Sequence, residues 1–298
     1  MSITLEFYKE KIENFESMSF EERRKAVTDL KLDDKQHNKA TLKGIFRVKP
    51  AKLAVSEYSF KNRFGKHVDC YTLKQCVPMR EMREPSPAQL KARQRLPLLA
   101  MLKTEQGSVS AKACSWLEQE PLFLDTETTG LDDQAQIIEI AILDASGKVL
   151  LCQRIKPTVE INEGAQGIHG INATDLENCP SWPEVAGEVQ QILDGKTVIV
   201  FNADYDTRLL KQTATAYGDN LDWLTNCTFL CAMHLAARMY GATNKYGTIS
   251  LINACIEAGV AWKGAAHSAE ADTQATLDLV KNIAQFNIDI NEKLKNLT

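Results

Sequence analysis

The sequence lacks the features that typify membrane proteins and disulfide-stabilised secreted proteins. No window approaches the run of about 18 uninterrupted apolar residues that suggests a membrane-spanning helix. Residues 1–6 do not show the charged-then-apolar order of a secretory signal. The eight cysteines include no Cys-x-x-Cys pair, which favours reduced thiols over disulfides. We therefore expect a cytoplasmic protein that makes no contact with a membrane.

Basic residues are scarce in the C-terminal part of the chain. The formal net charge is −4, but residues 1–120 hold 23 Lys and Arg against 16 Asp and Glu, whereas residues 121–298 hold 12 against 23. An acidic domain binds a polyanion poorly unless metal ions or another domain compensate its charge. The basic N-terminal part is the candidate for that compensation.

The length of 298 residues is sufficient for two domains. We expect a helical segment at 1–34, a small basic α+β accessory domain at 35–118 and an α/β domain at 119–298. Ser19, followed three residues later by Glu22, predicts a capping box at a helix start. Within the accessory domain, short strands are predicted at 45–48, 56–60 and 67–73, with a hairpin turn at 62–66.

Basic and aromatic residues are interleaved in the accessory domain. Between Lys35 and Lys103 the chain holds 16 Lys and Arg against 4 Asp and Glu. This mixture suits phosphate contact and base stacking, although it also fits a small β module with a solvated basic face, or a surface that docks a protein partner. We recognise no family in this half of the chain. The candidates for contact with a nucleic acid are Arg47, Lys61, Arg63 and Lys66.

Two carboxylates end a short apolar run in the sequence Phe-Leu-Asp-Thr-Glu-Thr-Thr-Gly-Leu at 123–131. An apolar run followed by glycine is typical of a buried strand that ends in a turn. Because side chains alternate along a strand, Asp125 and Glu127 point to the same side. Carboxylates crowded on one side repel each other unless a cation lies between them, and oxygen ligands favour Mg²⁺ or Mn²⁺. A solvated strand end is the alternative for this motif alone.

Two later segments carry further carboxylates and one histidine. Asp206 follows a strand-like run at 196–201 and lies just inside a predicted helix, near the carboxyl end of the sheet. His267 and Asp272 are five residues apart, with Asp272 inside a predicted helix and His267 at or before its start. Each segment alone also fits a surface aspartate or a histidine at a helix start. Together the three segments predict a metal-dependent nuclease site.

Three motifs resemble those of the DnaQ-like DEDDh 3′→5′ exonuclease family, which includes proofreading subunits and exodeoxyribonuclease X-like enzymes. They are the motif at 123–131, Asn-Ala-x-Tyr-Asp at 202–206 and His-x-x-x-x-Asp at 267–272. The resemblance implies an RNase H-like α/β fold, with a mixed central sheet flanked by helices. It further implies that two divalent cations, Mg²⁺ or Mn²⁺, and a general base, His267, perform the reaction. The implied metal ligands are Asp125, Glu127, Asp206 and Asp272.

The resemblance also assigns residues to the terminal nucleotide of the substrate. Phe201 stands where the family commonly has His, and Tyr205 replaces the more usual Phe. These departures concern substrate preference rather than catalysis. The segment 167–171 is bracketed by glycines and is expected to be a loop. Strand-edge threonines and a surface-loop histidine are the alternatives for part of this set. The assigned residues are Thr126, Thr128, Gly130, Leu131, Ile168, His169, Asn202 and Tyr205.

The function that we expect is 3′→5′ exonucleolytic hydrolysis of DNA by a two-metal mechanism, which releases nucleoside 5′-monophosphates. The basic region would anchor the substrate or a protein partner. An exoribonuclease of the same fold is an alternative, because the choice depends on whether the pocket accepts a 2′-OH. A non-catalytic module that docks on a nucleic acid or a polymerase complex is the other, although the complete set of five active-site residues argues against it. A dimer is compatible with this fold, but nothing in the sequence demonstrates one.

Overall fold

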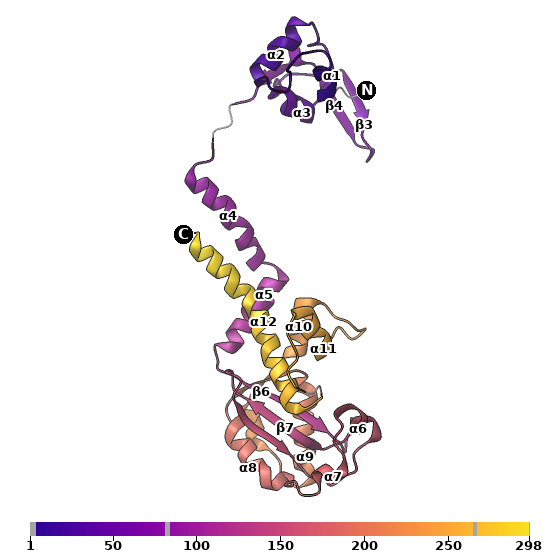
Figure 1. Ribbon diagram of the computed structural model, residues 1–298, viewed down its shortest axis with the longest axis vertical. Helices are drawn as coiled ribbons and strands as arrows, with labels where there is room; N and C mark the ends of the chain where they lie inside the picture. The colour runs from indigo at the N-terminus through magenta and orange to yellow at the C-terminus, as the bar shows by residue number, and fades with distance from the viewer. Residues whose placement is uncertain (1–3, 81–83, 265–266, 298) are drawn as a thin grey trace. The chain divides into compact units, whose positions relative to one another are not determined.

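Two compact units make up the chain. The computed structural model describes residues 4–80, 84–264 and 267–297 (Figure 1). The N-terminal unit is Met1–Pro85 and the C-terminal unit is Ser86–Thr298, and each has its own hydrophobic core. In the described part of the chain, no helix is both long enough and apolar enough to cross a membrane.

The N-terminal unit is a small α+β fold around an aromatic core. Tyr8, Phe15 and Phe46 are buried, and their rings contact one another. The capping box predicted at Ser19 and Glu22 is present at the start of a helix. The strands form two small sheets, with orders β1-β4-β3 and β2-β5. The elements are α1 (Leu5–Lys9), α2 (Phe20–Asp29), β1 (His37–Asn38), α3 (Lys39–Thr41), the π-helical η1 (Leu42–Phe46), β2 (Val48–Pro50), β3 (Tyr58–Lys61), β4 (His67–Tyr71), the 3-10 helix η2 (Leu73–Gln75) and β5 (Cys76–Pro78).

The strand predicted at 45–48 is wrong. The chain forms the π-helical turn η1 there, and β2 begins only at Val48. The turn buries Leu42, Ile45 and Phe46 together, whereas a strand would direct neighbouring side chains to opposite faces. Burial of these side chains against the aromatic core therefore outweighs the local strand preference. The hairpin predicted around residues 62–66 is present as β3 and β4.

The C-terminal unit is built on one mixed sheet with the strand order β10-β9-β6-β7-β8. β7 is antiparallel to β6 and β8, whereas β9 is parallel to β6 and β10. This arrangement confirms the expected mixed sheet flanked by helices. The elements are α4 (Pro87–Leu102), α5 (Glu105–Leu117), β6 (Leu122–Thr128), β7 (Ile137–Leu143), β8 (Val149–Arg154), α6 (Glu163–His169), α7 (Ala173–Leu176), α8 (Trp182–Leu193), β9 (Thr197–Val200), α9 (Ala203–Ala216), the 3-10 helix η3 (Asp222–Asn226), β10 (Thr228–Cys231), α10 (Ala232–Tyr240), α11 (Leu251–Ala258) and α12 (Ala269–Asn296).

Two apolar clusters cover the two faces of this sheet. On one face the strands pack against α5, α10, α11 and α12, and on the other against α8 and α9. β7 is buried along its whole length, because helices cover both of its faces. β6 lies in the centre of the sheet, between β9 and β7. Its carboxyl end can therefore be reached by side chains from helices on both faces, and α12 crosses the sheet at this strand (Figure 1).

Helices α4 and α5 belong to the C-terminal unit, whereas the sequence analysis placed them in the accessory domain. Trp116 of α5 packs into the core under α12. Ser110 also joins these two helices, because its Oγ donates to the carbonyl of Ala284 at 3.1 Å and accepts from the amide of Asn287 at 2.8 Å. These contacts join residues more than 170 positions apart, so no local pattern indicates them.

Candidate metal centre

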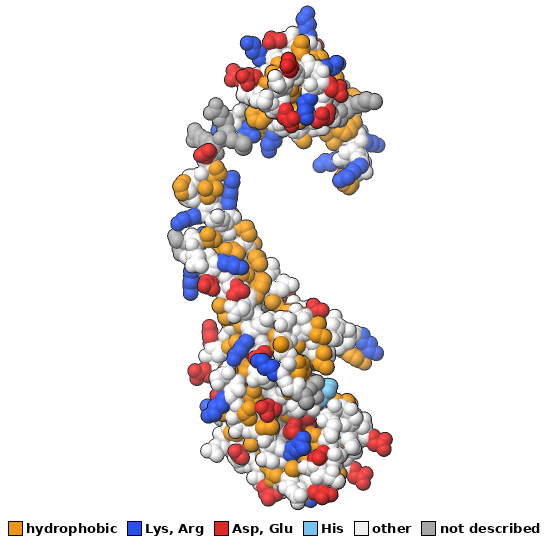
Figure 2. All heavy atoms as spheres, viewed as in Figure 1, with side chains coloured by type: hydrophobic (Ala, Val, Ile, Leu, Met, Phe, Trp, Pro, Cys, Tyr) orange, Lys and Arg blue, Asp and Glu red, His pale blue; other side chains and the backbone are white. Residues whose placement is uncertain are grey.

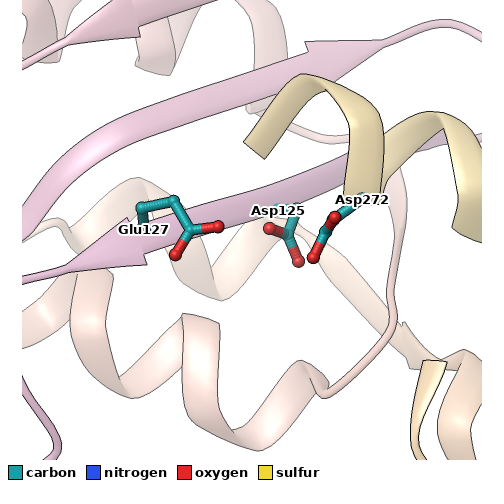
Figure 3. Close-up of side chains that lie close together, drawn as sticks. All are labelled: Asp125, Glu127 and Asp272. Atoms are coloured by element: carbon teal, nitrogen blue, oxygen red, sulfur yellow. The ribbon is translucent and has the colours of Figure 1, made fainter. Parts of the chain in front are cut away.

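Asp125 and Glu127 lie on one face of β6, near its carboxyl end. One residue separates them, so the alternation of the strand turns both side chains the same way. Thr126 and Thr128 point to the opposite side and are buried. Figure 3 shows the carboxylates of Asp125 and Glu127 on the strand and that of Asp272 beside them on the helix. The strand therefore presents two acidic groups to the helix that crosses it.

Asp272 reaches this position from the first turn of α12. Ser268 is the N-cap of the helix, and its side chain accepts from the amide of Ala271. Carboxylate oxygens of Asp125, Glu127 and Asp272 all lie within 4.8 Å of one another. The positive end of the helix dipole favours an acidic group here, but by no more than about 2 kcal/mol. Three crowded carboxylates need a stronger source of positive charge.

Asp206 is the fourth carboxylate, and it comes from the first turn of α9. It is almost completely buried, with 3% of its surface exposed. Thr126 Oγ1 donates a hydrogen bond to its Oδ1 at 2.8 Å. The charge of Asp206 also raises the pKa of Asp125, so the two groups are electrostatic neighbours. The structure thus places three of the four predicted ligands, Asp125, Glu127 and Asp272, within 4.8 Å of one another. It places the fourth, Asp206, close enough to Asp125 to raise its pKa.

We call Asp125, Glu127, Asp206 and Asp272 the acidic cluster. Its carboxylates hold their protons more strongly than isolated acids do. Burial raises the pKa of Asp125 well above its usual value, and the charges of the neighbouring acids raise it further. Burial, with the charges of Asp272, Glu139 and Asp206, raises the pKa of Glu127 to about 8. Burial also raises the pKa of Asp206 to about 7 and shifts the pKa of Asp272 upward. The folded protein therefore resists full ionisation of the cluster at neutral pH.

A divalent cation fits this arrangement of side chains. The donors are all carboxylate oxygens, which hard cations such as Mg²⁺ and Mn²⁺ prefer to nitrogen or sulfur. The donors converge from separate elements on one place. A bound cation would offset the mutual repulsion that contributes to the raised pKa values. The cluster is therefore suited to divalent metal.

His267 lies next to Asp272, just before α12. Its φ of 62° is left-handed, which is uncommon for a residue other than glycine. Its backbone amide donates to Oδ1 of Asp272 at 3.2 Å, and the residue is half-buried. This hydrogen bond thus links the backbone conformation at His267 to the position of the Asp272 carboxylate.

Glu139 is a further acidic residue at the cluster, and no motif in the sequence indicates it. It lies opposite Glu127 in the β6–β7 ladder and is buried. Its Oε2 accepts from the amide of Ala269, the first residue of α12, at 2.9 Å, and its Oε1 accepts from Nε of Arg154 at 3.1 Å. Glu139 therefore joins β7 and β8 to the start of the helix that carries Asp272. The signal in the sequence is one charge inside an otherwise apolar strand.

A pocket of about 670 Å³ opens beside the acidic cluster. Glu127 forms part of its wall, so the pocket and the cluster adjoin. Leu131 and Ile168 also line it, although 79% and 61% of their surfaces are exposed. Apolar side chains this exposed offer a surface for a flat, apolar ligand group. All eight residues that the sequence assigned to the substrate line this pocket: Thr126, Thr128, Gly130, Leu131, Ile168, His169, Asn202 and Tyr205.

The hydroxyl groups of the pocket are engaged within the protein. Thr128 Oγ1 and Tyr205 Oη are 2.8 Å apart, and they lie 2.9 Å and 3.0 Å from the carbonyl oxygen of Gly130. Two protons are available for these three contacts, so two of them are hydrogen bonds at any moment. The hydroxyl of Thr126 donates its hydrogen bond to Asp206. The tyrosine at position 205 therefore fixes the end of β6 through its hydroxyl, which a phenylalanine lacks.

The segment 167–171, predicted to be a loop, contains the end of helix α6. Asn162 caps the start of this helix, because its side chain accepts from the amide of Gly164 at 2.8 Å. Gly170 ends it with a φ of 73°. Gly164 and Gly167 lie inside the helix and conceal the helical pattern, since glycine is a poor helix former.

His169, at the end of α6, is held by two backbone groups. Its Nδ1 accepts from the amide of Ile171 at 3.0 Å, which leaves the proton on Nε2. Nε2 therefore donates to the carbonyl of Thr128 at 3.2 Å. Burial lowers the pKa of His169, which favours this neutral form. The ring ties α6 to the end of β6 and gives the pocket a fixed wall.

The four basic residues predicted to contact a nucleic acid lie in the N-terminal unit, but in two places. Lys61, Arg63 and Lys66 lie on the β3–β4 hairpin and are exposed. Arg47 lies at the end of the π-helical turn and is half-buried. Three of the four candidate residues therefore lie together on one hairpin.

Comparison with known proteins relates the C-terminal unit to exonucleases. The family model described as Exonuclease matches residues 122–280. An uncharacterized exonuclease of Escherichia phage 186, CP81, is 38% identical over 185 residues, which are 60% of this chain and 95% of that protein. The DNA polymerase III subunit epsilon of Rickettsia typhi is 35% identical over 95 residues, 30% of this chain and 42% of that protein. A solved structure of exonuclease X in complex with 5′ overhanging duplex DNA covers 57% of this chain and 98% of its own, with 24% identity and a TM-score of 0.42.

The matched segment contains every residue of the acidic cluster. It begins at the first residue of β6 and ends within α12, so it includes Asp125, Glu127, Asp206 and Asp272. It also covers more than half of the chain. The protein is therefore a nuclease with an RNase H-like fold, and the chain belongs to the DnaQ-like exonuclease family.

Proposed function

We propose that this nuclease is a metal-dependent 3′→5′ exonuclease that hydrolyses DNA and releases nucleoside 5′-monophosphates. The observation that carries the proposal is the convergence of Asp125, Glu127 and Asp272 within 4.8 Å, directly beside the 670 Å³ pocket. An enzyme that removes nucleotides from an end needs a cavity for one terminal nucleotide next to the hydrolytic groups. The match to a DNA polymerase III subunit supports DNA as the polymer.

In this proposal the four carboxylates hold two Mg²⁺ or Mn²⁺ ions. Such ions, when bound, lower the pKa of water and offset the charge on the leaving oxygen. Asp125 would be one of the residues that hold the ions, because its carboxylate lies within 4.8 Å of those of Glu127 and Asp272. Thr126 orients Asp206 through its hydrogen bond, and α12 fixes Asp272 through its N-terminal turn.

His267 is proposed to accept a proton from the attacking water. The coupling of its backbone to Asp272 keeps it beside the acidic cluster. Imidazole exchanges protons near neutral pH, and a correctly placed general base contributes about 10²- to 10⁴-fold to a rate. In this role the histidine contacts the reacting water but binds no metal.

The terminal nucleotide is proposed to lie in the pocket, with its base against Leu131 and Ile168. Exposed apolar side chains accept any base, because each base has an apolar face. Asn202 also lines the pocket and is the polar candidate for contact with the sugar or phosphate. The hydroxyls of Thr128 and Tyr205 would act indirectly, by fixing the pocket wall.

We further propose that the nuclease domain comprises residues 86–298 and that the N-terminal unit is an accessory domain for the nucleic acid. The packing of α5 into the core under α12 supports this boundary over the one expected at residue 119.

The test uses matched DNA and RNA oligonucleotides, single- and double-stranded, each labelled at the 5′ end and carrying a free or a blocked 3′ end. In the presence of Mg²⁺ or Mn²⁺, we expect stepwise shortening of DNA with a free 3′ end and no shortening of blocked DNA. Immediate release of the 5′ label, or internal cuts in blocked DNA, would overturn the proposed polarity. Preferential degradation of RNA would make RNA the substrate.

Two variants control the experiment. Asp125→Asn should abolish the shortening, because the variant loses a charge at the centre of the cluster. Asp204→Asn, an exposed position on the same helix as Asp206, should leave it unchanged.

A further inference from the structure

The tip of the β3–β4 hairpin presents basic and aromatic side chains to solvent. Lys61, Arg63 and Lys66 are exposed, and Phe64 has 76% of its surface exposed. None of these three cations forms an ion pair with another residue of the described ranges. Figure 2 shows Lys and Arg side chains gathered around hydrophobic ones at the end of the hairpin, which extends from the N-terminal unit in Figure 1. We call this group of four residues the hairpin tip.

The turn itself does not depend on these side chains. Asn62 Oδ1 accepts from the amides of Phe64 and Lys66 at 2.9 Å and 3.0 Å. Gly65 adopts a φ of 74°, and its amide donates to the carbonyl of Asn62 at 2.9 Å. Asn62, Gly65 and the backbone thus define the turn, as expected of turn chemistry. The turn therefore does not need the four side chains of the hairpin tip.

Phe64 is exposed in a form suited to stacking. It is absent from the aromatic core of the N-terminal unit. The guanidinium of Arg63 lies 4.7 Å from its ring centroid, on one face of the ring. A flat ligand group could add to the other face. An exposed phenylalanine with a cation on one side has the chemistry of a base-stacking platform.

The charge of the surrounding region is also favourable to a polyanion. Residues 35–80 hold 11 Lys and Arg against 2 Asp and Glu, and one of those acids, Asp69, lies on β4. The N-terminal unit as a whole has 18 Lys and Arg against 13 Asp and Glu, whereas the C-terminal unit has 17 against 26. A nucleic acid is thus attracted by the N-terminal unit and repelled by the net charge of the nuclease unit.

We propose that the hairpin tip binds a single-stranded segment of nucleic acid. Lys61, Arg63 and Lys66 contact successive phosphates, and one base stacks on the open face of Phe64. The binding is independent of base sequence, because neither cations nor a phenyl ring read base edges. This site lies in a different unit from the acidic cluster and needs no metal ion.

The test measures binding of the full-length protein to a fluorescent oligothymidylate by fluorescence anisotropy, in the presence of EDTA. Removal of divalent metal prevents hydrolysis, so the result does not depend on the proposed exonuclease activity. The variants are Phe64→Ala and the triple variant Lys61→Ala, Arg63→Ala, Lys66→Ala. The matched control removes three other exposed lysines of the same unit, Lys25→Ala, Lys35→Ala, Lys52→Ala. Thermal unfolding of each variant verifies that it is folded.

The triple variant should bind about tenfold more weakly at low salt, and the slope of log affinity against log salt should fall by roughly 2, since each phosphate contact on a single strand contributes about 0.7. Phe64→Ala should weaken binding by about tenfold as well, but without a change in this slope. On an oligonucleotide with abasic sites, the effect of Phe64→Ala should disappear. Oligouridylate, measured in parallel, shows whether the site distinguishes RNA from DNA.

Two results would overturn the proposal. The first is wild-type affinity in the triple variant, which would leave the hairpin tip as a surface for a protein. The second is an equal loss in the control variant, which would mean that only the total charge of the unit matters. Failure of the oligonucleotide degradation test, by contrast, would leave this binding result unaffected.

Discussion

The carboxylates of the metal centre lower the stability of the folded protein when no cation is bound. Asp125, Glu127, Asp206 and Asp272 all have raised pKa values, so the native state binds more protons than the unfolded chain does between the two sets of pKa values. Stability that depends on these protons is present at acidic pH and is lost as the pH rises. A pKa that is one unit higher in the folded protein than in the unfolded chain changes the free energy of unfolding by about 1.4 kcal/mol.

We therefore expect the metal-free protein to unfold at progressively lower temperature as the pH rises from 4.5, the ordinary value for Glu127, to about 8, its value in the fold. Addition of Mn²⁺ should reverse the decline, because the cation replaces the protons. Glu127→Gln should make the decline shallower. Calorimetry in EDTA and in Mn²⁺ measures this directly. A melting temperature that rises over this pH range in EDTA would show that the cluster does not destabilise the metal-free fold.

His267→Ala should lower kcat by about 10²- to 10⁴-fold, because the attacking water loses its general base. Binding of Mn²⁺ should be retained, and added imidazole should restore part of the rate. His234→Ala, an exposed histidine of α10, is the control. An unchanged kcat in His267→Ala would remove the histidine from the mechanism.

The places of the four proposed metal ligands on their strand and helices could be predicted from sequence, because their motifs are local. Asp125 and Glu127 end a strand, and Asp206 begins a helix, so each carries a recognisable pattern of neighbours. Glu139 carries no such pattern, since its role depends on contacts with Ala269 and Arg154. The use of the Thr128 and Tyr205 hydroxyls within the wall of the pocket was likewise hidden, because it depends on tertiary contacts.

At the scale of elements, the start of α12 determines where Asp272 lies. Glu139 accepts from the first amide of this helix and is held in turn by Arg154. Groups that orient a metal ligand typically contribute about 10- to 100-fold to affinity or activity. The β7–β8 pair therefore acts on the acidic cluster through the helix, without contributing one of the four proposed ligands.

We expect Glu139→Gln to weaken Mn²⁺ binding by about tenfold or more, because the amide side chain cannot accept from both partners with the same strength. The KM for an oligonucleotide should change less than kcat. Glu270→Gln, one residue into the same helix and exposed, is the control. Equal Mn²⁺ affinity in Glu139→Gln and the wild type, measured by titration, would show that the start of α12 is fixed by other contacts.

Two elements were not indicated by the sequence, because a tertiary contact or a cap overrides their local pattern. The π-helical turn Leu42–Phe46 and the helix α6 both contradict their local patterns, because burial of Phe46 and the cap at Asn162 decide them. The strands β6 and β9 and the helices α9 and α12 follow their patterns closely. The local sequence pattern thus predicts the elements that carry the proposed metal ligands better than it predicts the other elements of the fold.

At the scale of the whole molecule, the chain separates an acidic nuclease unit from a basic unit. The boundary lies before α4 because the packing of α5 joins it to α12. Charge and motif positions in the sequence instead predict that the nuclease domain starts at residue 119. Composition changes gradually along the chain, whereas packing places the division at one position.

A pair of truncated proteins compares these two boundaries. The fragment 86–298 should fold and keep nuclease activity, since it contains its complete core. The fragment 119–298 should aggregate or unfold at a much lower temperature, because it loses the buried side chains of Val109, Ala113 and Trp116, and removal of one large core side chain typically costs about 3–5 kcal/mol. Equal melting temperatures of the two fragments would contradict this division of the chain.

Binding of a divalent cation by the acidic cluster is the property on which the proposed activity depends. Calorimetric titration of Mn²⁺ at neutral pH, into the wild type, Asp125→Asn and Asp204→Asn, measures it most directly. We expect the wild type and Asp204→Asn to bind Mn²⁺ alike, and Asp125→Asn to lose at least one ion or to bind it more than tenfold more weakly. Equal binding by Asp125→Asn and the wild type would show that the acidic cluster is not the metal centre.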